Sequence, residues 1–492
     1  MKTSVFGVAL LALAAGAAPA DCRATVTNDD AFVIAEDGYA RAFRGTWIAT
    51  VYDPRFSSDL SKMSVDGVKA YWRSLLDTAA RLNVNAVIFQ LRPCADALYR
   101  GSLEPWSMHL VGEQGREPEG GFDPLRFMLD ECRARGMQLH ALFNPFRVTY
   151  NEGDEKKLAK DHNYFRHPEW FVKYGKSVYY DPGVPACRDW TVRVIMDVVS
   201  RYDVDGVHID DYFYPYTIQK QGRDVPFPDE KSFAKYGGGF ADINAWRDNN
   251  SDLLVADIAR RLRGLRPDVV FGVAPYNDNG YCVRHLHCDA VKWARNGWLD
   301  YLMPQLYYGE NCRGDAFWWD AQAKGCRLYA GRFVKWLSRT VQKGPRKGMG
   351  ELDNMLQMHA QMTNVSGVCW WSSHALMQNV SNVTDRLAPH YVRKTLVPLY
   401  AGRPRTPPAG VTDATAKADG GRVTLAWRHP APAAGEPKAV FTAVFRGAAA
   451  HPELVTARTS AVLPGGAGET FRLVALDRLQ NAARAVTVVA LN

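Results

Sequence analysis

The sequence predicts an α/β fold in which a (β/α)8 TIM barrel is followed by a small all-β sandwich. Three observations support this prediction. Eight short apolar runs alternate with helical segments in one continuous series. Polar and aromatic residues follow the carboxyl end of nearly every run, where barrel enzymes place their active sites. After residue 396, a Pro/Gly-rich stretch leads into short alternating strands.

The barrel strands are predicted from β-branched and aromatic runs, and the helices from apolar residues at helical spacing. The predicted strands are 44–51, 85–91, 138–143, 205–210, 269–274, 299–305, 327–330 and 367–371. The predicted helices are 65–82, 124–135, 188–202, 246–265, 290–296, 316–324 and 351–362. Asp123 is the expected N-cap of the second helix, with Pro124 at its first position. Doubly wound sheets also alternate in this way, but eight units over about 350 residues fit a barrel with long loops.

The domain boundaries are predicted from changes in composition along the chain. We expect a signal peptide at 1–20, an N-terminal segment at 21–43, the barrel at 44–396, a linker at 397–410 and the sandwich at 411–492. In the sandwich, Val423, Leu425 and Trp427 share one face of a strand, and we expect them to form core rather than a sugar platform.

The N-terminus predicts export. Lys2 precedes an apolar run at 5–17 and an Ala18-Pro-Ala20 cleavage site. The run is shorter than the roughly 20 residues that span a bilayer. A periplasmic or extracellular location is therefore expected, with a lipid anchor at Cys22 as the secondary alternative. No later segment is long and apolar enough to cross a membrane.

Charge and cysteine content exclude other classes. The formal net charge of +8 is spread over 60 Lys and Arg residues rather than clustered, which argues against nucleic acid as a partner. Nine cysteines, an odd number, include two pairs close enough in sequence for loop disulfides, Cys282 with Cys288 and Cys312 with Cys326, but spacing alone does not fix the pairing. No C-x-x-C pair occurs, and neither a metal nor a cofactor is predicted. The sequence carries no signal for an oligomeric state.

The stretch from Asp205 to Pro215 carries the main catalytic signal. Strand alternation turns His208 and Asp210 to one face and Asp211 to the other. Asp210 is the predicted nucleophile or ion stabiliser for an oxocarbenium-like transition state, and a second carboxyl group must protonate the leaving oxygen. The candidates for that acid are Asp278, Glu310 and Asp211, with Asp96 and Glu104 as further rim carboxylates. Each could instead form an ordinary ion pair or helix cap.

Amides and aromatic rings at the other strand ends suit a polyhydroxylated ligand, so the predicted partner is a polysaccharide. The predicted substrate-binding residues are Trp47, Gln90, Arg92, Asp96, Asn144, Arg147, His208, Tyr212, Tyr276, Gln305, Tyr307 and Trp371. Arg92 and Arg147 have two interpretations, because they could bind an acidic sugar substituent or pair with Asp210.

Two other function classes remain open. One is a carbohydrate-binding protein on a barrel scaffold that has no second carboxylate placed to react. The other is a metal-dependent polysaccharide deacetylase built on His208 and Asp210, with His140 nearby. Serine-hydrolase and phosphate-loop motifs are absent from the sequence.

Ordered blocks along the chain carry a family resemblance. They include Arg44-Gly-Thr-Trp47, Gln90-Leu-Arg-Pro93, Phe143-Asn-Pro-Phe-Arg147, His167-Pro-Glu-Trp170, the Asp205 to Pro215 stretch and Pro304-Gln-Leu-Tyr307. Together, over roughly 42–395, they resemble the glycosyl-hydrolase-like 10 family of bacterial envelope proteins. The resemblance implies a (β/α)8 glycoside hydrolase whose nucleophile ends the fourth strand, at Asp210. It also implies cleavage of peptidoglycan glycan strands, particularly those stripped of peptides. The strands around Trp427 and at 471–478 resemble a fibronectin type III module.

Overall fold

The centre of the molecule is a closed barrel of eight parallel strands, in chain order around the barrel. The computed structural model describes residues 33–51, 60–342 and 347–492, so the predicted signal peptide and Cys22 lie outside the described residues. The barrel strands are β3 (Phe43–Ile48), β4 (Ala86–Arg92), β5 (Gln138–Phe143), β8 (Gly206–Ile209), β11 (Val270–Val273), β12 (Tyr301–Leu302), β13 (Arg327–Phe333) and β14 (Val365–Trp371). Pairing of β14 with β3 closes the barrel. All eight predicted strands are confirmed.

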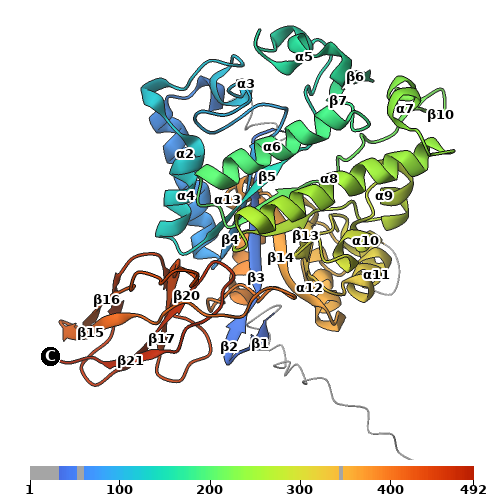
Figure 1. Ribbon diagram of the computed structural model, residues 1–492. Helices are drawn as coiled ribbons and strands as arrows, with labels where there is room; N and C mark the ends of the chain where they lie inside the picture. Colours follow the sequence, from blue (N-terminus) through green and yellow to red (C-terminus); the bar gives the residue numbers. More distant parts are fainter. Residues whose placement is uncertain (1–32, 52–59, 343–346) are drawn as a thin grey trace, which may run out of the picture.

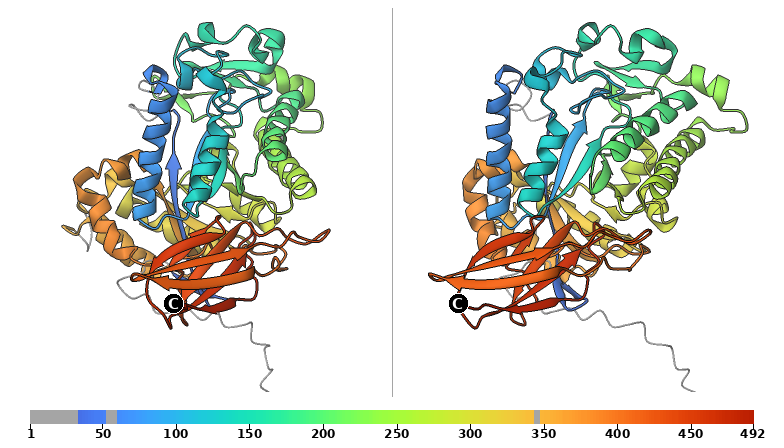
Figure 2. Two further views of the ribbon diagram at one scale, coloured as in Figure 1. Left: turned by 90° about the vertical axis from the view of Figure 1, so that its left-hand side faces the viewer. Right: turned by 60° about the vertical axis from the view of Figure 1, so that its left-hand side comes forward.

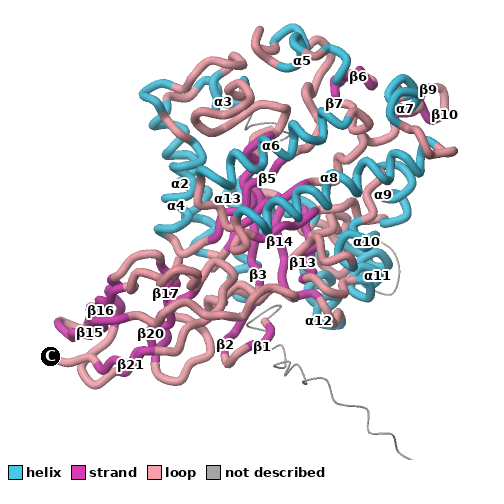
Figure 3. Tube along the Cα trace, in the orientation of Figure 1, coloured by secondary structure: helices cyan, strands magenta, loops and turns pink. Residues whose placement is uncertain are grey.

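Helices surround the barrel on the outside, as Figure 3 shows with strands in magenta inside a ring of cyan helices. They are α2 (Val65–Arg81), α4 (Pro124–Ala134), α6 (Pro185–Arg201), α8 (Ile243–Leu265), α10 (Ala290–Arg295), α11 (Arg313–Gln322), α12 (Glu351–Gln361), α13 (Ser373–Met377) and α14 (Val383–Leu387). The Asp123 carboxylate accepts the Arg126 N–H, with Pro124 at the first position of α4, so the predicted cap is confirmed. Among the described residues, no helix combines the length and apolar character needed to span a bilayer.

The sixth strand is shorter than the sequence predicts. Residues 299–305 were expected to be extended, but β12 contains only Tyr301 and Leu302. Pro304 has no N–H to continue the ladder. Its carbonyl still accepts the Gly331 N–H at 2.9 Å, and the Gln305 N–H donates to Pro275. The backbone therefore stays between its neighbours and delivers Gln305 to the rim.

Inside the barrel, glycines make room for large side chains. A Cβ on Gly206 would lie 2.6 Å from the His140 ring, and one on Gly272 would lie 2.1 Å from the Tyr301 ring. Because contacts this short do not occur, these strand positions admit only glycine while the rings keep their places. The interior is a packed core beneath the rim rather than a channel.

Short elements in the connecting loops build up the upper part of the molecule in Figure 1, at the carboxyl ends of the strands. They are α3 (Met108–Val111), α5 (Asn163–Arg166), β6 (Phe171–Tyr174), β7 (Ser177–Tyr180), β9 (Ile218–Lys220), β10 (Arg223–Val225), α7 (Glu230–Tyr236) and α9 (Asn279–Leu286). The pairs β6–β7 and β9–β10 are antiparallel hairpins.

The C-terminal part forms two antiparallel sheets, which lie under the end of the barrel opposite the rim in both views of Figure 2. One sheet has the order β15-β16-β19 and the other β18-β17-β20-β21. The strands are β15 (Thr412–Asp419), β16 (Arg422–Arg428), β17 (Phe441–Arg446), β18 (Leu454–Thr456), β19 (Ser460–Pro464), β20 (Thr470–Leu476) and β21 (Val486–Val489). Val423, Leu425 and Trp427 lie in the core between the sheets, as predicted. A further hairpin, β1 (Ile34–Glu36) with β2 (Tyr39–Arg41), lies beside this part of the chain.

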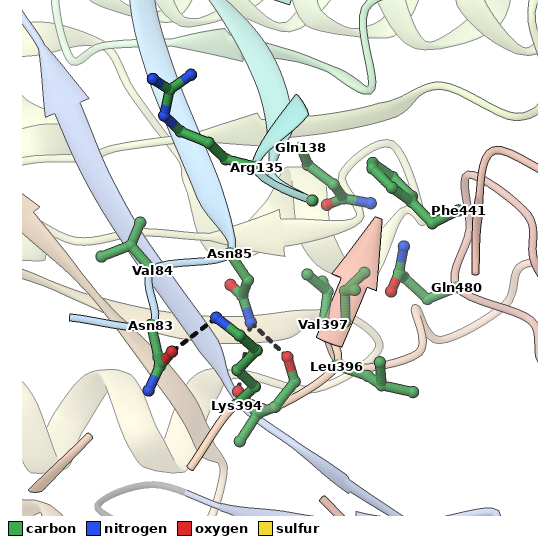
Figure 4. A pocket seen from close by; sticks show the side chains of 13 residues that line it. Asn83, Val84, Asn85, Arg135, Gln138, Lys394, Leu396, Val397, Phe441 and Gln480 are labelled. Carbon is green, nitrogen blue, oxygen red and sulfur yellow. Dashed lines mark hydrogen bonds between the residues drawn. The ribbon is translucent and has the colours of Figure 1, made fainter. Parts of the chain in front are cut away.

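The two parts share a tight interface. Figure 4 shows a cavity there, lined by Asn83, Asn85, Lys394 and Phe441 among others. Its volume is about 20 Å³, enough for one water molecule. The Lys394 ammonium donates to Asn83 Oδ1 at 2.8 Å across it. This cavity is a small packing gap in the interface, at the end of the barrel opposite Asp210.

All eight described cysteines are buried free thiols, so neither of the two pairs close in sequence forms a disulfide. Cys312 precedes and Cys326 follows the ten-residue helix α11. At ~1.5 Å per residue this helix is about 15 Å long. Cys282 and Cys288 are neighbours, since the Cys288 N–H donates to the Cys282 carbonyl at 3.0 Å, but their sulfur atoms are not bonded.

Candidate active site

Strand β8 delivers Asp210 to the rim of the barrel. Val207 and Ile209 are completely buried among the side chains that pack under the helices, whereas His208 faces the barrel interior beside Tyr301. This alternation is the predicted one. Asp210 follows the last residue of the strand and is half-buried at the rim.

Asn144, the residue after β5, orients Asp210. Its amide Nδ2 donates to both carboxylate oxygens of Asp210, at 3.2 Å and 3.0 Å. The amide oxygen accepts the Arg147 N–H at 2.8 Å, which fixes the direction of the amide. Burial raises the pKa of Asp210, while the Arg147 charge, the Asn144 amide and the Tyr212 N–H oppose the rise by favouring the carboxylate.

Asp211 occupies a different environment, although it is the next residue. It is 1% exposed and accepts a hydrogen bond from the Tyr216 hydroxyl. Burial first, and then the adjacent Asp210 charge, raise its pKa to about 7, against hydrogen bonds from Tyr216 and Gln305. A carboxyl group with a pKa near 7 is partly protonated at neutral pH and can donate a proton.

Aromatic side chains line the mouth around this pair. Tyr212 packs edge-to-face on Tyr216 at 5.2 Å, and the Arg147 guanidinium lies over the Tyr212 ring at 4.9 Å. Tyr276 packs against Tyr216, and burial together with the charges of both aspartates raises the pKa of Tyr307. The predicted residues Asn144, Arg147, Tyr212, Tyr276, Gln305 and Tyr307 therefore gather around Asp210 and Asp211.

Three other predicted ligand residues form hydrogen bonds with neighbouring parts of the chain. Arg92 forms two 2.6 Å hydrogen bonds with Glu104, and both side chains are buried. The Gln90 amide oxygen accepts the Thr50 N–H at 2.7 Å. Asp96 is buried and accepts the Cys94 N–H at 3.1 Å.

Two tryptophans lie lower in the mouth. Trp47 is 2% exposed and packs on His208 and on the half-buried Trp371. A fully covered Trp47 supports the site from below and does not face it.

The two remaining acid candidates have local structural roles. Asp278 is exposed and caps α9 by accepting the Tyr281 N–H at 3.0 Å. Glu310 lies in a short 3-10 turn at Gly309–Cys312, where its N–H donates to Glu351 and its carboxylate lies 3.9 Å from Arg313.

The histidines do not converge on a metal position. His140 and His208 each place Nδ1 2.9 Å from the Tyr301 hydroxyl. Burial lowers the pKa of His140 to about 4 and that of His208 well below its usual value, so both rings are neutral at pH 7. Among the residues that the structure describes, no three His, Cys, Asp or Glu side chains form a metal-binding group.

The sequence prediction counted Tyr216 among the aromatic residues of the rim loops, but it gave Tyr281 and His285 no part in the site. The Tyr216 hydroxyl bonds Asp211, Tyr281 packs on Tyr216, and His285 stacks on Tyr281 at 4.6 Å. Tyr281 and His285 follow Asp278 on α9 at helical spacing, so recognising Asp278 as an N-cap would have placed them on one helix face.

The chain is similar to a known protein family and to several known proteins. A sequence model of the family described as glycosyl hydrolase-like 10 matches residues 42–331. Glycosyl hydrolase YngK of Bacillus subtilis is 35% identical over 382 residues, or 73% of each chain. Glycosyl hydrolase DigH of Escherichia coli K12 is 33% identical over 368 residues, or 67% of this chain and 82% of DigH. The PgaB (BpsB) glycoside hydrolase domain from Bordetella bronchiseptica aligns at 11% identity and a TM-score of 0.45, over 70% of this chain and 98% of that domain. The family match and the two relatives together show that the chain belongs to the glycosyl hydrolase-like 10 family.

Proposed function

We propose that this chain is an exported hydrolase that cleaves O-glycosidic bonds in a cell-envelope or extracellular polysaccharide. The observation that carries the proposal is the Asp210 carboxylate, which stands at the carboxyl end of a barrel strand with both oxygens held by Asn144. An ionised carboxylate held in a fixed orientation can stabilise or attack a sugar cation. Family membership and relatives named glycosyl hydrolases support the same reaction class.

In this proposal Asp210 is the nucleophile or ion stabiliser, and Asp211 supplies the proton for the leaving oxygen. A general acid must hold a proton near the working pH. The pKa of Asp211, raised to about 7 by burial and by Asp210, meets that requirement. Asp278 and Glu310 have the cap and loop roles described above, so we assign neither of them to the chemistry.

The proposed substrate is the glycan strand of peptidoglycan, in particular strands without peptides. The apolar faces and hydroxyl edges of Tyr212, Tyr276 and Tyr307 suit stacking on sugar rings and hydrogen bonding to their hydroxyls. The apolar segment at 5–17 and the cleavage site at 18–20 support an exported location, periplasmic or extracellular. The three-plus-four arrangement of the C-terminal sheets supports a fibronectin type III-like module.

The principal alternative is a barrel that binds glycans without cleaving them. It requires that Asp211, which is 1% exposed, never reaches the glycosidic oxygen. The deacetylase alternative lacks support, because His140 and His208 direct their Nδ1 atoms to Tyr301 rather than sharing a position with Asp210.

Incubation with purified, peptide-free peptidoglycan strands and a panel of other polysaccharides tests the proposal. We expect new reducing ends from one substrate, and a rate lower by about 10²–10⁴-fold for Asp210→Asn and for Asp211→Asn. Asp278→Asn is the matched control, because asparagine caps a helix as well as aspartate does. Glycan binding without new reducing ends would favour the binding alternative, and full activity in Asp210→Asn would exclude the assigned chemistry.

A further inference from the structure

A second cavity lies beside the catalytic rim. Its volume is about 250 Å³, and it lies between the loop that follows β8 and helix α9. Its apolar base is a cluster of three aromatic rings, Tyr174, Tyr214 and Phe227, each less than 9% exposed. Its polar lining comprises Thr217, Asp224, Asn244, Arg247, Arg284, His285 and His287.

The charges of this cavity leave one cation without a partner. Arg247 is neutralised by Asp229, which accepts two of its hydrogen bonds. His287 Nδ1 lies 2.6 Å from the Asp248 carboxylate. Arg284 is exposed and forms no ion pair with any residue in the described part of the chain.

The cavity connects to the catalytic pair through ring contacts. His285, which lines it, stacks on Tyr281 at 4.6 Å, and Tyr281 lies 6.1 Å from Tyr216. Tyr216 donates its hydroxyl hydrogen to Asp211. Only this row of aromatic side chains therefore separates the described cavity lining from Asp211.

The arginines that the sequence offered for an acidic substituent are not available for it. Arg92 is fully buried with Glu104. Arg147 is 5% exposed, with its guanidinium between the rings of Tyr150 and Tyr212. If the substrate carries an anionic group, another cation must receive it.

We propose that this cavity is a subsite for a sugar unit that bears a carboxylate, with Arg284 as the residue that binds the carboxylate. The inference rests on the proposed function and specifies its substrate class. A guanidinium offers two parallel N–H donors to a carboxylate, and the aromatic base suits the apolar face of a sugar ring. The cavity is smaller than the ~300–1,000 Å³ of sites for drug-sized ligands, which suits one sugar unit. Asp224 lines the same cavity, and its negative charge favours a singly charged carboxylate over a dianionic phosphate.

The test compares peptide-free peptidoglycan strands, whose lactyl groups end in carboxylates, with the same strands after those carboxylates are reduced to alcohols. We expect the parent enzyme to show a lower KM for the carboxylated strands. Arg284→Gln should raise that KM about tenfold, with kcat unchanged and no effect on the reduced strands. Arg260→Gln is the matched control, since Arg260 is also an exposed helix arginine but pairs with Asp257. Equal KM values for both strands in the parent, or an equal effect of Arg284→Gln on both, would overturn the inference.

A binding measurement separates this inference from the proposed reaction. Equilibrium titration of both strand preparations uses Asp210→Asn, with and without Arg284→Gln. Preference for carboxylated strands that disappears with Arg284→Gln and weakens with added salt supports the subsite even if no strand is cleaved. Equal binding of both preparations overturns the subsite even if cleavage is observed.

Discussion

At the scale of single residues, two carboxyl groups on adjacent residues lie in different environments. Asp210 receives two hydrogen bonds from Asn144, which favour its charged form. Asp211 is buried beside that charge, and its pKa is raised to about 7. Strand alternation predicts that the two side chains diverge, but it does not give their pKa values. These depend on burial, on Asn144 and Gln305, which follow other strands, and on Tyr216 from the loop after β8 itself.

Asp211 should make the folded state less stable as the pH rises. Its pKa is higher in the folded chain than the ordinary carboxyl value, so its contribution is fully present below about pH 4 and lost as the pH rises through about 7. Between pH 5 and 8 this amounts to about 2–3 kcal/mol. Asp211→Asn keeps an acceptor for Tyr216 but cannot ionise. In urea unfolding, the variant should lack this loss of stability, and parallel pH curves for parent and variant would contradict the prediction.

Asn144→Ala should alter the pH dependence of catalysis. The change removes two hydrogen bonds to the charged form of Asp210, so the pKa of Asp210 should rise further. The acidic limb of kcat/KM then moves to higher pH. The lost bonds to a charge are worth about 1.5–3 kcal/mol, or about 10–100-fold in rate. Asn163→Ala is the control, because Asn163 is a buried asparagine whose side chain bonds only the Tyr180 hydroxyl among the described residues. An unshifted profile in Asn144→Ala would show that Asn144 does not tune Asp210.

At the scale of elements, apolar runs predict the strands well because each barrel strand is buried on both faces. The loops are less predictable. Arg92 and Glu104 were predicted separately, and their pairing depends on how the loop after β4 folds back. The spacing of Cys312 and Cys326 is compatible with a loop disulfide, but α11 separates the two residues. Sequence proximity does not measure distance once a helix intervenes.

Barrel packing predicts unequal effects for two glycines. Gly272→Ala places a methyl group 2.1 Å from the Tyr301 ring, which hydrogen bonds to His140 and His208 hold in place. We expect a loss of about 1–3 kcal/mol of unfolding free energy. Gly264 lies in α8 with open space at its Cβ position, so Gly264→Ala should stabilise by up to about 1 kcal/mol. Urea unfolding of both variants checks the prediction, which fails if Gly272→Ala is neutral.

At the scale of the whole molecule, the C-terminal sheets are fixed to the barrel through the strand that carries the site. Asp205 immediately precedes β8, and Asp210 immediately follows the other end of that strand. Arg478, 3% exposed, donates to Asp205, Asp203 and Asp268, and we call these four residues the Arg478 cluster. The residues after 396 also pack on the barrel, since Arg403 pairs with Asp300 at 2.6 Å. The Pro/Gly composition predicted a linker here, but composition gives no information on such ion pairs.

The Arg478 cluster should couple the unfolding of the two parts. Arg478→Met removes the shared cation and leaves Asp205 with Arg133 alone, which still binds it at 2.7 Å. Breaking a buried pair costs about 3–5 kcal/mol, and the retained Arg133 should reduce the loss to about 2 kcal/mol. Arg428→Met is the control, because Arg428 is 80% exposed and 3.6 Å from Asp413, so its effect should stay within about 0.5 kcal/mol.

Unfolding by urea, followed by tryptophan fluorescence and by circular dichroism, measures both the size of the loss and the coupling. The parent should unfold in one transition, and Arg478→Met at a lower urea concentration. The Arg478 charge also holds the pKa of Asp268 down at about 2, against the effect of burial and together with Arg266. That stabilisation is present above the ordinary carboxyl range and is lost as the pH falls toward 2, so the parent should lose more stability on acidification than Arg478→Met does. Equal acid sensitivity and an unchanged midpoint would mean that other contacts hold the sheets, such as the Arg133 guanidinium over the Phe441 ring, and that the Arg478 charge contributes nothing measurable.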